Sequence, residues 1–412
     1  SGERALLSQN VVEEFVEELR SQGSNGVEGE DGELIVFPSS WSFFYVDPIS
    51  LEVKPYDKEH LIQFTKLVDS CRGMGVGGGA PGWVQDEPPL MRPIVSYFIQ
   101  CRYSSISYFP GIAYDIETLK WMKEMAKAMG HEFGIGVETF SPLSFSGNSL
   151  DVAIHFSDEV SEVGLDPMPI MGISAPLDWH AAWAQSVAEN IGGYILLRLL
   201  GFKRVYPSFR LFTGSMRSGL ISFGAPEYAL ILLMRVKIRK FYNIPVGVAE
   251  SMLTTAKLPD QHAATEKASL TLFAALAGYR EFEGAGTLSL DEIFSPQQFI
   301  VDLEVRDYIA RVIRGIDKVS IKDAIELVQE GLTEGNFLAA PFTTNRWRDV
   351  YWRPRLFHQI PLSQWKKEPK RVLDEAWEVA REKIAKHDYE LDEDKVRELE
   401  AIVQRARKEL CG

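Results

Sequence analysis

Two glutamates and a population of aromatic residues are the side chains of this sequence that could do chemistry. Glu250 and Glu283 each lie at the end of an apolar run typical of a buried strand. Aromatic residues gather near the ends of other such runs, namely Tyr108, Phe109, Phe140, Phe145, Phe337, Phe342, Trp347, Tyr351 and Trp352. Ring faces attract cations, each desolvated contact contributing roughly 0.5 to 2 kcal/mol. The set predicts a site for a quaternary ammonium ion, although most of these rings could equally fill the core.

The two glutamates have a second interpretation that the sequence leaves open. Either carboxylate could pair with a nearby cation such as Lys257 or Arg280 and serve only the fold. If the two glutamates bind a cationic ligand, their carboxylates would instead face that ligand. Spacing alone does not decide between the two.

Other chemistries lack their usual patterns. The run Gly73 to Gly78 satisfies GxGxxG, but a helix precedes it and prolines follow it, so we interpret it as a loop. Neither HExxH nor CxxC occurs, and the seven histidines are scattered, so we expect no metal site. Asp260-Gln261-His262 partly matches the cobalamin motif DxHxxG, yet Thr265 takes the place of its glycine. GxSxG and Walker A motifs are also missing, which leaves nucleophilic hydrolysis without support.

Composition narrows the partners and the compartment. A formal net charge of -14 over 412 residues disfavours nucleic acid and anionic membranes. The sequence has no apolar run of membrane-spanning length, and its first residues do not begin a signal peptide. Its three cysteines are far apart and odd in number. We therefore expect a cytoplasmic protein.

The apolar runs alternate with helical segments through most of the chain. Strands are predicted over 106–112, 133–140, 167–174, 204–212, 244–251, 279–285 and 336–343. The helices between them have N-caps at Asp115, Asp178 and Asp260 and end at Gly130, Gly201 and Gly278. Such repetition favours parallel βα units closed into a TIM (β/α)8 barrel, an α/β fold.

Three parts follow from this pattern. We expect an N-terminal cap region of helices and short strands over 1–104, the barrel over 105–366, and C-terminal amphipathic helices packed on the barrel over 367–412. The carboxyl ends of barrel strands meet at one mouth. The residues placed there are Phe140, Ser174, Glu250, Ser251, Glu283 and Phe342.

Several segments together resemble the trimethylamine methyltransferase family. The most recognisable are Thr255 to Gln261, Glu266-Lys267, Ala274 to Gly278 and Gly284 to Leu288; further matches are Tyr45 to Pro48, Ala188 to Asn190, Gly214, Gly224 to Glu227, Asn336 to Leu338, Arg348, Pro354 to Leu356 and Trp365. Their order and spacing hold across about residues 35 to 410.

The resemblance implies a methyltransferase that moves a methyl group from a methylated, quaternary amine to the cob(I)alamin of a separate corrinoid protein. The cofactor would be carried by that partner, with none bound tightly by this chain. Some members contain pyrrolysine, but this sequence has only standard residues and is similar to the glycine betaine branch. We also expect a homo-oligomer.

Two departures bear on the substrate. Glu283 stands where many relatives have histidine before Gly-Ala-Gly, and Phe342 and Arg346 replace two histidines near the last predicted strand. A carboxylate in place of a donor favours a bare cation or a hydroxylated amine over a betaine.

The expected site follows from the mouth and the resemblance together. The predicted substrate-binding residues are Tyr108, Phe140, Glu250, Glu283, Phe337, Phe342, Arg346 and Trp347. The predicted corrinoid contacts are Ser174, Ser215 and Ser251. No residue is assigned a catalytic role beyond positioning, because the tertiary amine displaced from a quaternary ammonium ion leaves without needing a proton.

Two alternatives remain. The methyl donor could be a sulfonium or a methyl ether, and the ether would need an acid or a metal to help it leave. The chain could also be a non-catalytic protein that binds quaternary amines.

Overall fold

Two parallel sheets form the centre of the computed structural model, which describes residues 5–22, 32–111, 115–145 and 148–412. The first has the order β1-β8-β7, with bounds Ile35–Phe37, Glu281–Glu283 and Val248–Ala249. The second has the order β4-β5-β6, with bounds Gly134–Thr139, Glu162–Pro167 and Val205–Pro207. The expectation of an α/β fold with parallel strands is confirmed. Closure into a barrel is not shown, because within the described residues no closed sheet joins the two.

A third, mixed sheet lies beside β1; short strands were expected in this N-terminal region, but their pairing with strands that follow β8 was not. Its order is β3-β2-β10-β9, with bounds Val53–Pro55, Phe44–Val46, Ile293–Phe294 and Thr287–Leu288. Only the β2–β10 pair is parallel. This sheet joins the early chain to the segment that follows β8.

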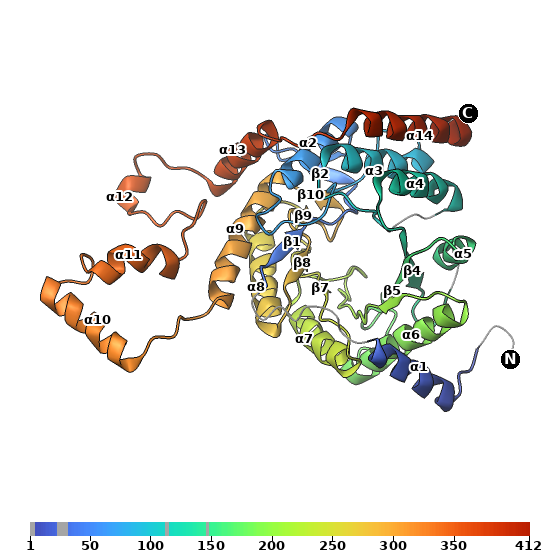
Figure 1. Cartoon of the computed structure of the whole chain (residues 1–412), viewed down its shortest axis with the longest axis horizontal. Helices are drawn as coiled ribbons and strands as arrows, with labels where there is room; N and C mark the ends of the chain where they lie inside the picture. The colour runs from blue at the N-terminus through green and yellow to red at the C-terminus, as the bar shows by residue number, and fades with distance from the viewer. Residues whose placement is uncertain (1–4, 23–31, 112–114, 146–147) are drawn as a thin grey trace.

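Helices surround the parallel sheets (Figure 1). The surrounding helices are α2 (Lys58–Asp69), α3 (Arg92–Tyr103), α4 (Ile116–Met129), α5 (Asn148–His155), α6 (Trp179–Leu199), α7 (Pro226–Phe241), α8 (Gln261–Ala277) and α9 (Pro296–Ile313). The short 3-10 helix η1 (Pro89–Met91) precedes α3, and α1 (Gln9–Ser21) packs on α6. An outer layer consists of α13 (Val372–Ala385) on α9 and α2, and α14 (Glu393–Cys411) on α4 and α3. None of the described helices is both long and apolar enough to span a bilayer.

The local signals for helix ends are confirmed. Asp115, Asp178 and Asp260 accept backbone hydrogen bonds as the N-caps of α4, α6 and α8. Gly130 and Gly278 close α4 and α8 in the left-handed conformation, at φ of 73° and 111°. These signals succeed because a cap satisfies backbone groups within one turn and needs no tertiary partner.

Two predicted strands are wrong. The segment 336–343 has no strand, because Pro341 begins helix α11 (Pro341–Val350); proline suits the first helical turn and cannot donate to a ladder. The run 167–174 is also misplaced, since β5 ends at Pro167 and only isolated bridges follow at Ile170 and Met171. Within the run 106–112, residues 106–111 contain no named strand, although the Gly111 carbonyl accepts a 3.1 Å hydrogen bond from the Gly136 amide.

An arm of short helices leaves the body after α9 and returns at α13 (Figure 1). It contains α10 (Ile321–Glu334), α11 and α12 (Leu362–Trp365). Gly331 is the one buried residue of α10, and neither of the other two has any. The three helices of the arm therefore bury almost no side chains, and the arm contacts the body mainly through Val350 and Arg355 to Phe357, which pair with Arg311 and Glu304 of α9.

A buried ion pair fixes the turn that follows β8. The Lys267 ammonium donates to the Asp302 carboxylate at 2.6 Å and to the Gly284 carbonyl at 2.8 Å. Asp302 also accepts from the Gly286 amide at 2.7 Å. Both side chains are fully buried, and burial lowers the pKa of Lys267 and raises that of Asp302. Helices α8 and α9 thereby hold the backbone next to Glu283.

Removing the cation of this pair should destabilise the protein strongly. We expect Lys267→Met to lower the free energy of unfolding by about 3 to 5 kcal/mol, because the Asp302 carboxylate would remain buried without its counter-charge. Urea denaturation measures the change. The double variant Lys267→Met/Asp302→Leu should recover only part of the loss, since the Gly286 amide then lacks its acceptor, and Lys322→Met, on the exposed face of α10, should show none. A single variant as stable as the wild type would contradict this role.

Candidate functional site

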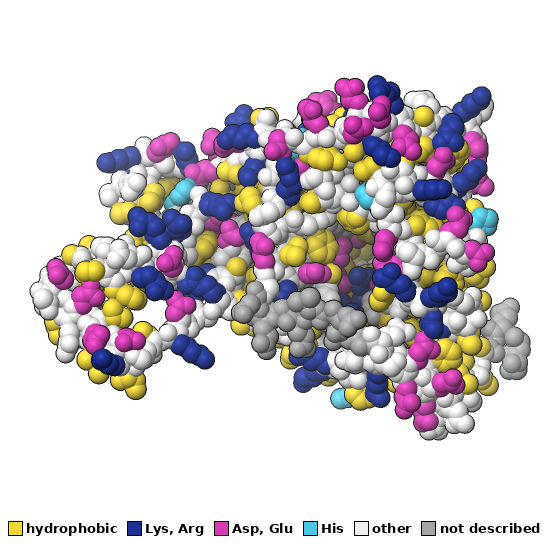
Figure 2. All heavy atoms as spheres, in the orientation of Figure 1, with side chains coloured by type: hydrophobic (Ala, Val, Ile, Leu, Met, Phe, Trp, Pro, Cys, Tyr) yellow, Lys and Arg dark blue, Asp and Glu magenta, His cyan; other side chains and the backbone are white. Residues whose placement is uncertain are grey.

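A cavity of about 970 Å³ opens between the two parallel sheets. Figure 2 shows a hollow near the centre of one face, with hydrophobic and acidic side chains gathered in it. Its aromatic lining consists of Trp41, Tyr108, Phe109, Phe140, Phe212 and Phe223. Its acidic lining consists of Glu132, Glu138, Glu162, Asp166, Glu250, Glu283 and Asp291. The volume suits a small organic ligand.

Glycines make room for the cavity along β4 and β5. Alternate residues of a strand face the same side, and the lining residues of β5, Glu162, Gly164 and Asp166, alternate in this way. Three lining positions on the two strands, Gly134, Gly136 and Gly164, have no side chain to fill the space. A Cβ atom at Gly136 or Gly164 would have its nearest neighbour at 3.8 Å, an ordinary van der Waals contact, so a small side chain would fit there but would take up part of the cavity.

Glu250 lines the cavity and is held there in a buried network. Its carboxylate accepts from Arg210 Nε at 2.9 Å, from Arg235 at 2.8 Å and from the Tyr228 hydroxyl at 2.9 Å. Burial alone would raise its pKa, but the two guanidinium groups outweigh burial and lower the pKa to about 2. Glu250 is therefore ionised and fully engaged by the protein.

Glu283 lies in the same cavity, but its pKa is shifted in the opposite direction. Burial, together with Glu250, Asp291 and Asp166, outweighs the pull of Arg210 and raises its pKa to about 7. Its negative charge and burial also raise the pKa of Tyr108, to about 12. Within the described parts of the chain, neither an ion pair nor a hydrogen bond neutralises this carboxylate. Glu283 is thus the carboxylate available to a ligand.

The cavity carries an excess of negative charge. Among the described lining residues, Arg210 is the single permanent cation, and it is already engaged with Asp166 at 3.2 Å and with Glu250. Burial lowers the pKa of His131, so this imidazole adds no charge at neutral pH. Burial also raises the pKa of Glu138, as expected where carboxylates crowd together. This arrangement favours a cationic ligand.

A family model described as trimethylamine methyltransferase matches residues 121–411. The chain belongs to this family. The match covers the elements from α4 to α14, and therefore most of the cavity wall.

Curated relatives support the same assignment within the family. Trimethylamine methyltransferase MttB of Methanosarcina barkeri is 30% identical over 276 residues, covering 66% of this chain and 55% of the relative. Glycine betaine methyltransferase of Desulfitobacterium hafniense is 23% identical, covering 89% and 80%. Proline betaine:corrinoid methyltransferase of Eubacterium limosum is 27% identical, covering 75% and 67%. The alignments with the Methanosarcina trimethylamine methyltransferases span about half of those proteins' length.

The structure brings together four of the predicted substrate residues of this family member. These are Tyr108, Phe140, Glu250 and Glu283, and all four line the cavity. The other four, Phe337, Phe342, Arg346 and Trp347, lie on the arm, where Arg346 faces Asp317 and Asp349. Their assumed place at the end of a strand was wrong, because that strand does not exist.

None of the three predicted corrinoid contacts lines the cavity. Ser174 accepts from the Ile170 amide, Ser215 accepts from the Ser218 amide, and buried Ser251 shares a 3.0 Å hydrogen bond with Thr271. These contacts serve local turns and packing, and the assignment of the three serines to a corrinoid stays a prediction.

Sequence reasoning missed the arginines and acidic residues that set the charge of the cavity. The missed side chains are Arg210, Arg235, Glu138, Asp166 and Asp291. Three of them, Glu138, Asp166 and Arg210, lie on or directly next to predicted strands, which could have drawn notice to them. Arg235 lies within helix α7 and gave no local signal.

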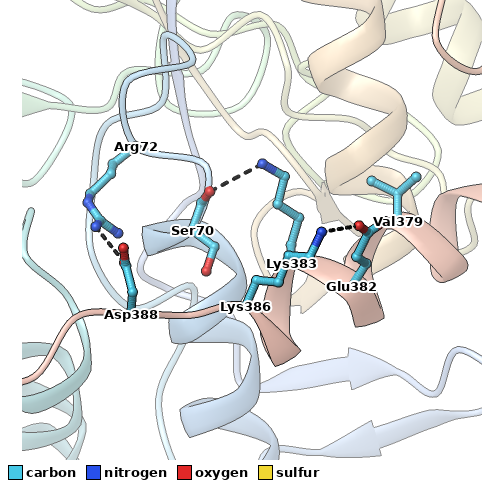
Figure 3. Close-up of a pocket in the computed structure, with 7 residues that line it drawn as sticks. All are labelled: Ser70, Arg72, Val379, Glu382, Lys383, Lys386 and Asp388. Carbon is cyan, nitrogen blue, oxygen red and sulfur yellow. Dashed lines mark hydrogen bonds and ion pairs between the residues drawn. The ribbon is translucent and has the colours of Figure 1, made fainter.

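A second cavity, of about 430 Å³, lies between the end of α2 and helix α13 (Figure 3). Four of its charged side chains pair with one another, Arg72 with Asp388 at 2.6 Å and Lys386 with Glu382, and Lys383 donates to the Ser70 carbonyl at 3.4 Å. Among the residues that the structure describes, no cluster of histidine, cysteine and carboxylate groups could hold a metal ion. The first cavity is therefore the candidate functional site.

The pKa of Glu283 should be visible in the stability of the protein. A carboxyl group whose pKa is near 7 in the folded state and 4.5 when unfolded binds its proton more tightly when folded. The wild type should therefore gain stability relative to Glu283→Gln as the pH falls from about 8 to 5. Urea denaturation across this range measures the difference between the two proteins.

The matched control is Glu281→Gln, an exposed carboxylate two residues earlier on the same strand. This control should show the wild-type pH profile. Parallel profiles for the wild type and Glu283→Gln would mean that Glu283 titrates in its ordinary range.

Proposed function

We propose that this chain is a methyltransferase that binds a quaternary methylated amine in the cavity and passes one methyl group to the cob(I)alamin of a separate corrinoid protein. One observation carries the proposal: an aromatic-walled cavity holds a carboxylate, Glu283, that the described residues leave without a counter-charge. Family membership and the names of the relatives are consistent with it.

We also propose that the parallel segments belong to one (β/α)8 barrel. Besides the six strands of the two sheets, Val76 makes a parallel bridge to Val36, and Gly111 is hydrogen-bonded to Gly136. These two segments would stand between β1 and β4, giving eight in all. The division into 1–104, 105–366 and 367–412 stays a prediction, and the proposed barrel would include both β1 and the Val76 segment from the first part.

The cavity residues would act by binding and orientation. Tyr108 and Phe140, both partly exposed in the cavity, would present ring surfaces to the methyl groups. Glu283 would sit against the positive charge. A cation bound there lowers the pKa of the carboxyl group, so Glu283 would be ionised in the complex. Positioning one methyl group toward the opening is then the main contribution of the protein.

The charge pattern favours a substrate without a carboxylate. Two relatives are named for betaines, whose carboxylate requires a positively charged partner. In this cavity Arg210 already contacts Asp166 and Glu250, and the remaining charged lining residues are predominantly acidic. We therefore propose a quaternary amine with a neutral or hydroxylated substituent.

The corrinoid would be held outside the cavity. A corrinoid ring is several times larger than the drug-sized molecules that pockets of this volume enclose, so it would stand at the opening on its own protein. When bound, cob(I)alamin supplies the nucleophile that accepts the methyl group. His262, in the partial cobalamin motif, is paired with Glu266 at 2.7 Å and does not face the cavity. These features fit a cytoplasmic enzyme whose partners are a small amine and a corrinoid protein.

The raised pKa of Glu283 also favours one alternative. A glutamic acid that is protonated near pH 7 could give its proton to the oxygen that leaves a methyl ether. A sulfonium, like a quaternary amine, would need no proton. A non-catalytic binding protein would return its ligand unchanged.

A screen of methylated compounds with free cob(I)alamin tests the proposal. Methylcobalamin, measured by its absorbance, should form with a carboxylate-free quaternary amine and not with methyl ethers. Glu283→Gln should raise KM for that amine roughly tenfold, about 1.4 kcal/mol of lost cation binding, with a smaller effect on kcat. Glu281→Gln serves as the control and should leave KM unchanged. Methyl transfer from an ether alone, or an unchanged ligand with every compound, would overturn the proposal.

A further inference from the structure

The arm, defined as residues 314–371, exposes an unusual amount of apolar surface. Ile321, Leu332 and Leu338 are 82%, 72% and 83% exposed. Further large apolar side chains on the arm are also exposed, namely Ile316, Val319, Ile325, Val328, Phe337, Phe342, Trp347, Tyr351, Ile360, Leu362 and Trp365. An apolar surface of this extent is typical of a protein–protein interface.

The pattern along α10 indicates an ordered interface. Ile321, Ile325, Val328 and Leu332 recur at spacings of three and four residues, which places them on one face of the helix. Isolated helices of up to about 15 residues are marginal in water, and most helices are stabilised by packing their apolar face. Because α10 has 14 residues and buries only Gly331, its apolar face requires a partner from outside this arm.

Charge indicates which partner this is. Between residues 341 and 371 there are eight basic side chains, Arg346, Arg348, Arg353, Arg355, Lys366, Lys367, Lys370 and Arg371, against two acidic ones, Asp349 and Glu368. The whole chain has a formal charge of -14, so the chain outside residues 341–371 carries -20, of which -2 belongs to residues 314–340 of the arm and -18 to the body. The body of a second copy supplies this complementary charge.

The body also offers matching apolar surface. Helix α7 leaves large apolar side chains exposed on its outer face, namely Leu230, Leu233, Met234 and Phe241. A stable interface buries roughly 800 Å² on each partner. Two copies that exchange arms about a two-fold axis would form the same contact twice.

We propose that the arm docks on the body of a second copy of this chain, so that the protein is a dimer with exchanged arms. The contact combines the apolar face of α10 with the basic segment from α11 to residue 371. This inference concerns assembly and does not depend on the proposed methyl transfer.

Sedimentation velocity on the full chain tests the proposal. The wild type should sediment as a dimer at micromolar concentration. Val328→Glu/Leu332→Glu should raise the dimer dissociation constant at least about 100-fold, since it places charges in a contact that must exclude water. Both positions are exposed within one chain, so circular dichroism and the thermal midpoint should stay close to wild type. Raising the salt from 0.05 to 0.5 M should weaken the wild-type dimer.

The control is Leu199→Glu, an exposed apolar residue at the end of α6, away from the arm. This variant should remain dimeric. A monomeric wild type, or a dimer as tight in the arm variant as in the control, would overturn the proposal. A monomeric wild type that loses binding to a corrinoid protein in the arm variant would also overturn it, and would assign the arm to that protein.

Discussion

The geometry of the cavity depends on the ion pairs of Arg210. Its guanidinium group contacts Asp166, on β5, and Glu250, which follows β7. These strands belong to different parallel sheets, and the described residues show no backbone ladder between β6 and β7. Ion pairs therefore link the two sheets where main-chain hydrogen bonds do not. Arg235, from α7, completes the link by also contacting Glu250.

The same link decides which carboxylate can bind a ligand. Two guanidinium groups stabilise the charge of Glu250, and one of them is shared with Asp166. Little positive potential is then left for Glu283, whose pKa rises as a consequence of burial near like charges. A ligand cation would supply the positive charge that the protein does not provide at Glu283. The ion pairs of Glu250 stabilise the fold, and the lack of an ion pair at Glu283 leaves its carboxylate available to a ligand.

A part of the cavity wall could be predicted because it follows from local rules. The carboxyl ends of parallel strands converge, and each strand end can be recognised from the residues beside it. Tyr108, Phe140, Glu250 and Glu283 were placed together on this basis, and all four line the cavity. The helix caps succeeded for the same reason. The (β/α)8 closure itself remains a proposal, since closure depends on pairings between distant segments.

The roles of the two glutamates could not be separated from sequence. Glu250 and Glu283 occupy equivalent positions at the ends of neighbouring strands, yet one has a pKa near 2 and the other near 7. The difference arises from Arg210 and Arg235, which lie 40 and 15 residues from Glu250 in the chain. The candidate partners expected from sequence, Lys257 and Arg280, instead bind Ser289 and backbone carbonyls. The role of each carboxylate therefore depends on partners that are distant in sequence, which local sequence patterns do not reveal.

The error at residues 336–343 has a different physical origin. Its apolar composition matches a buried strand, and burial was inferred from composition. The structure places these residues on an arm where Phe337 and Leu338 are exposed. An apolar composition indicates that a side chain will be buried, but it does not indicate whether its own chain or another molecule buries it. If a second copy covers the arm, the apolar signal was sound, and only the assumption that one chain contains its whole core was mistaken.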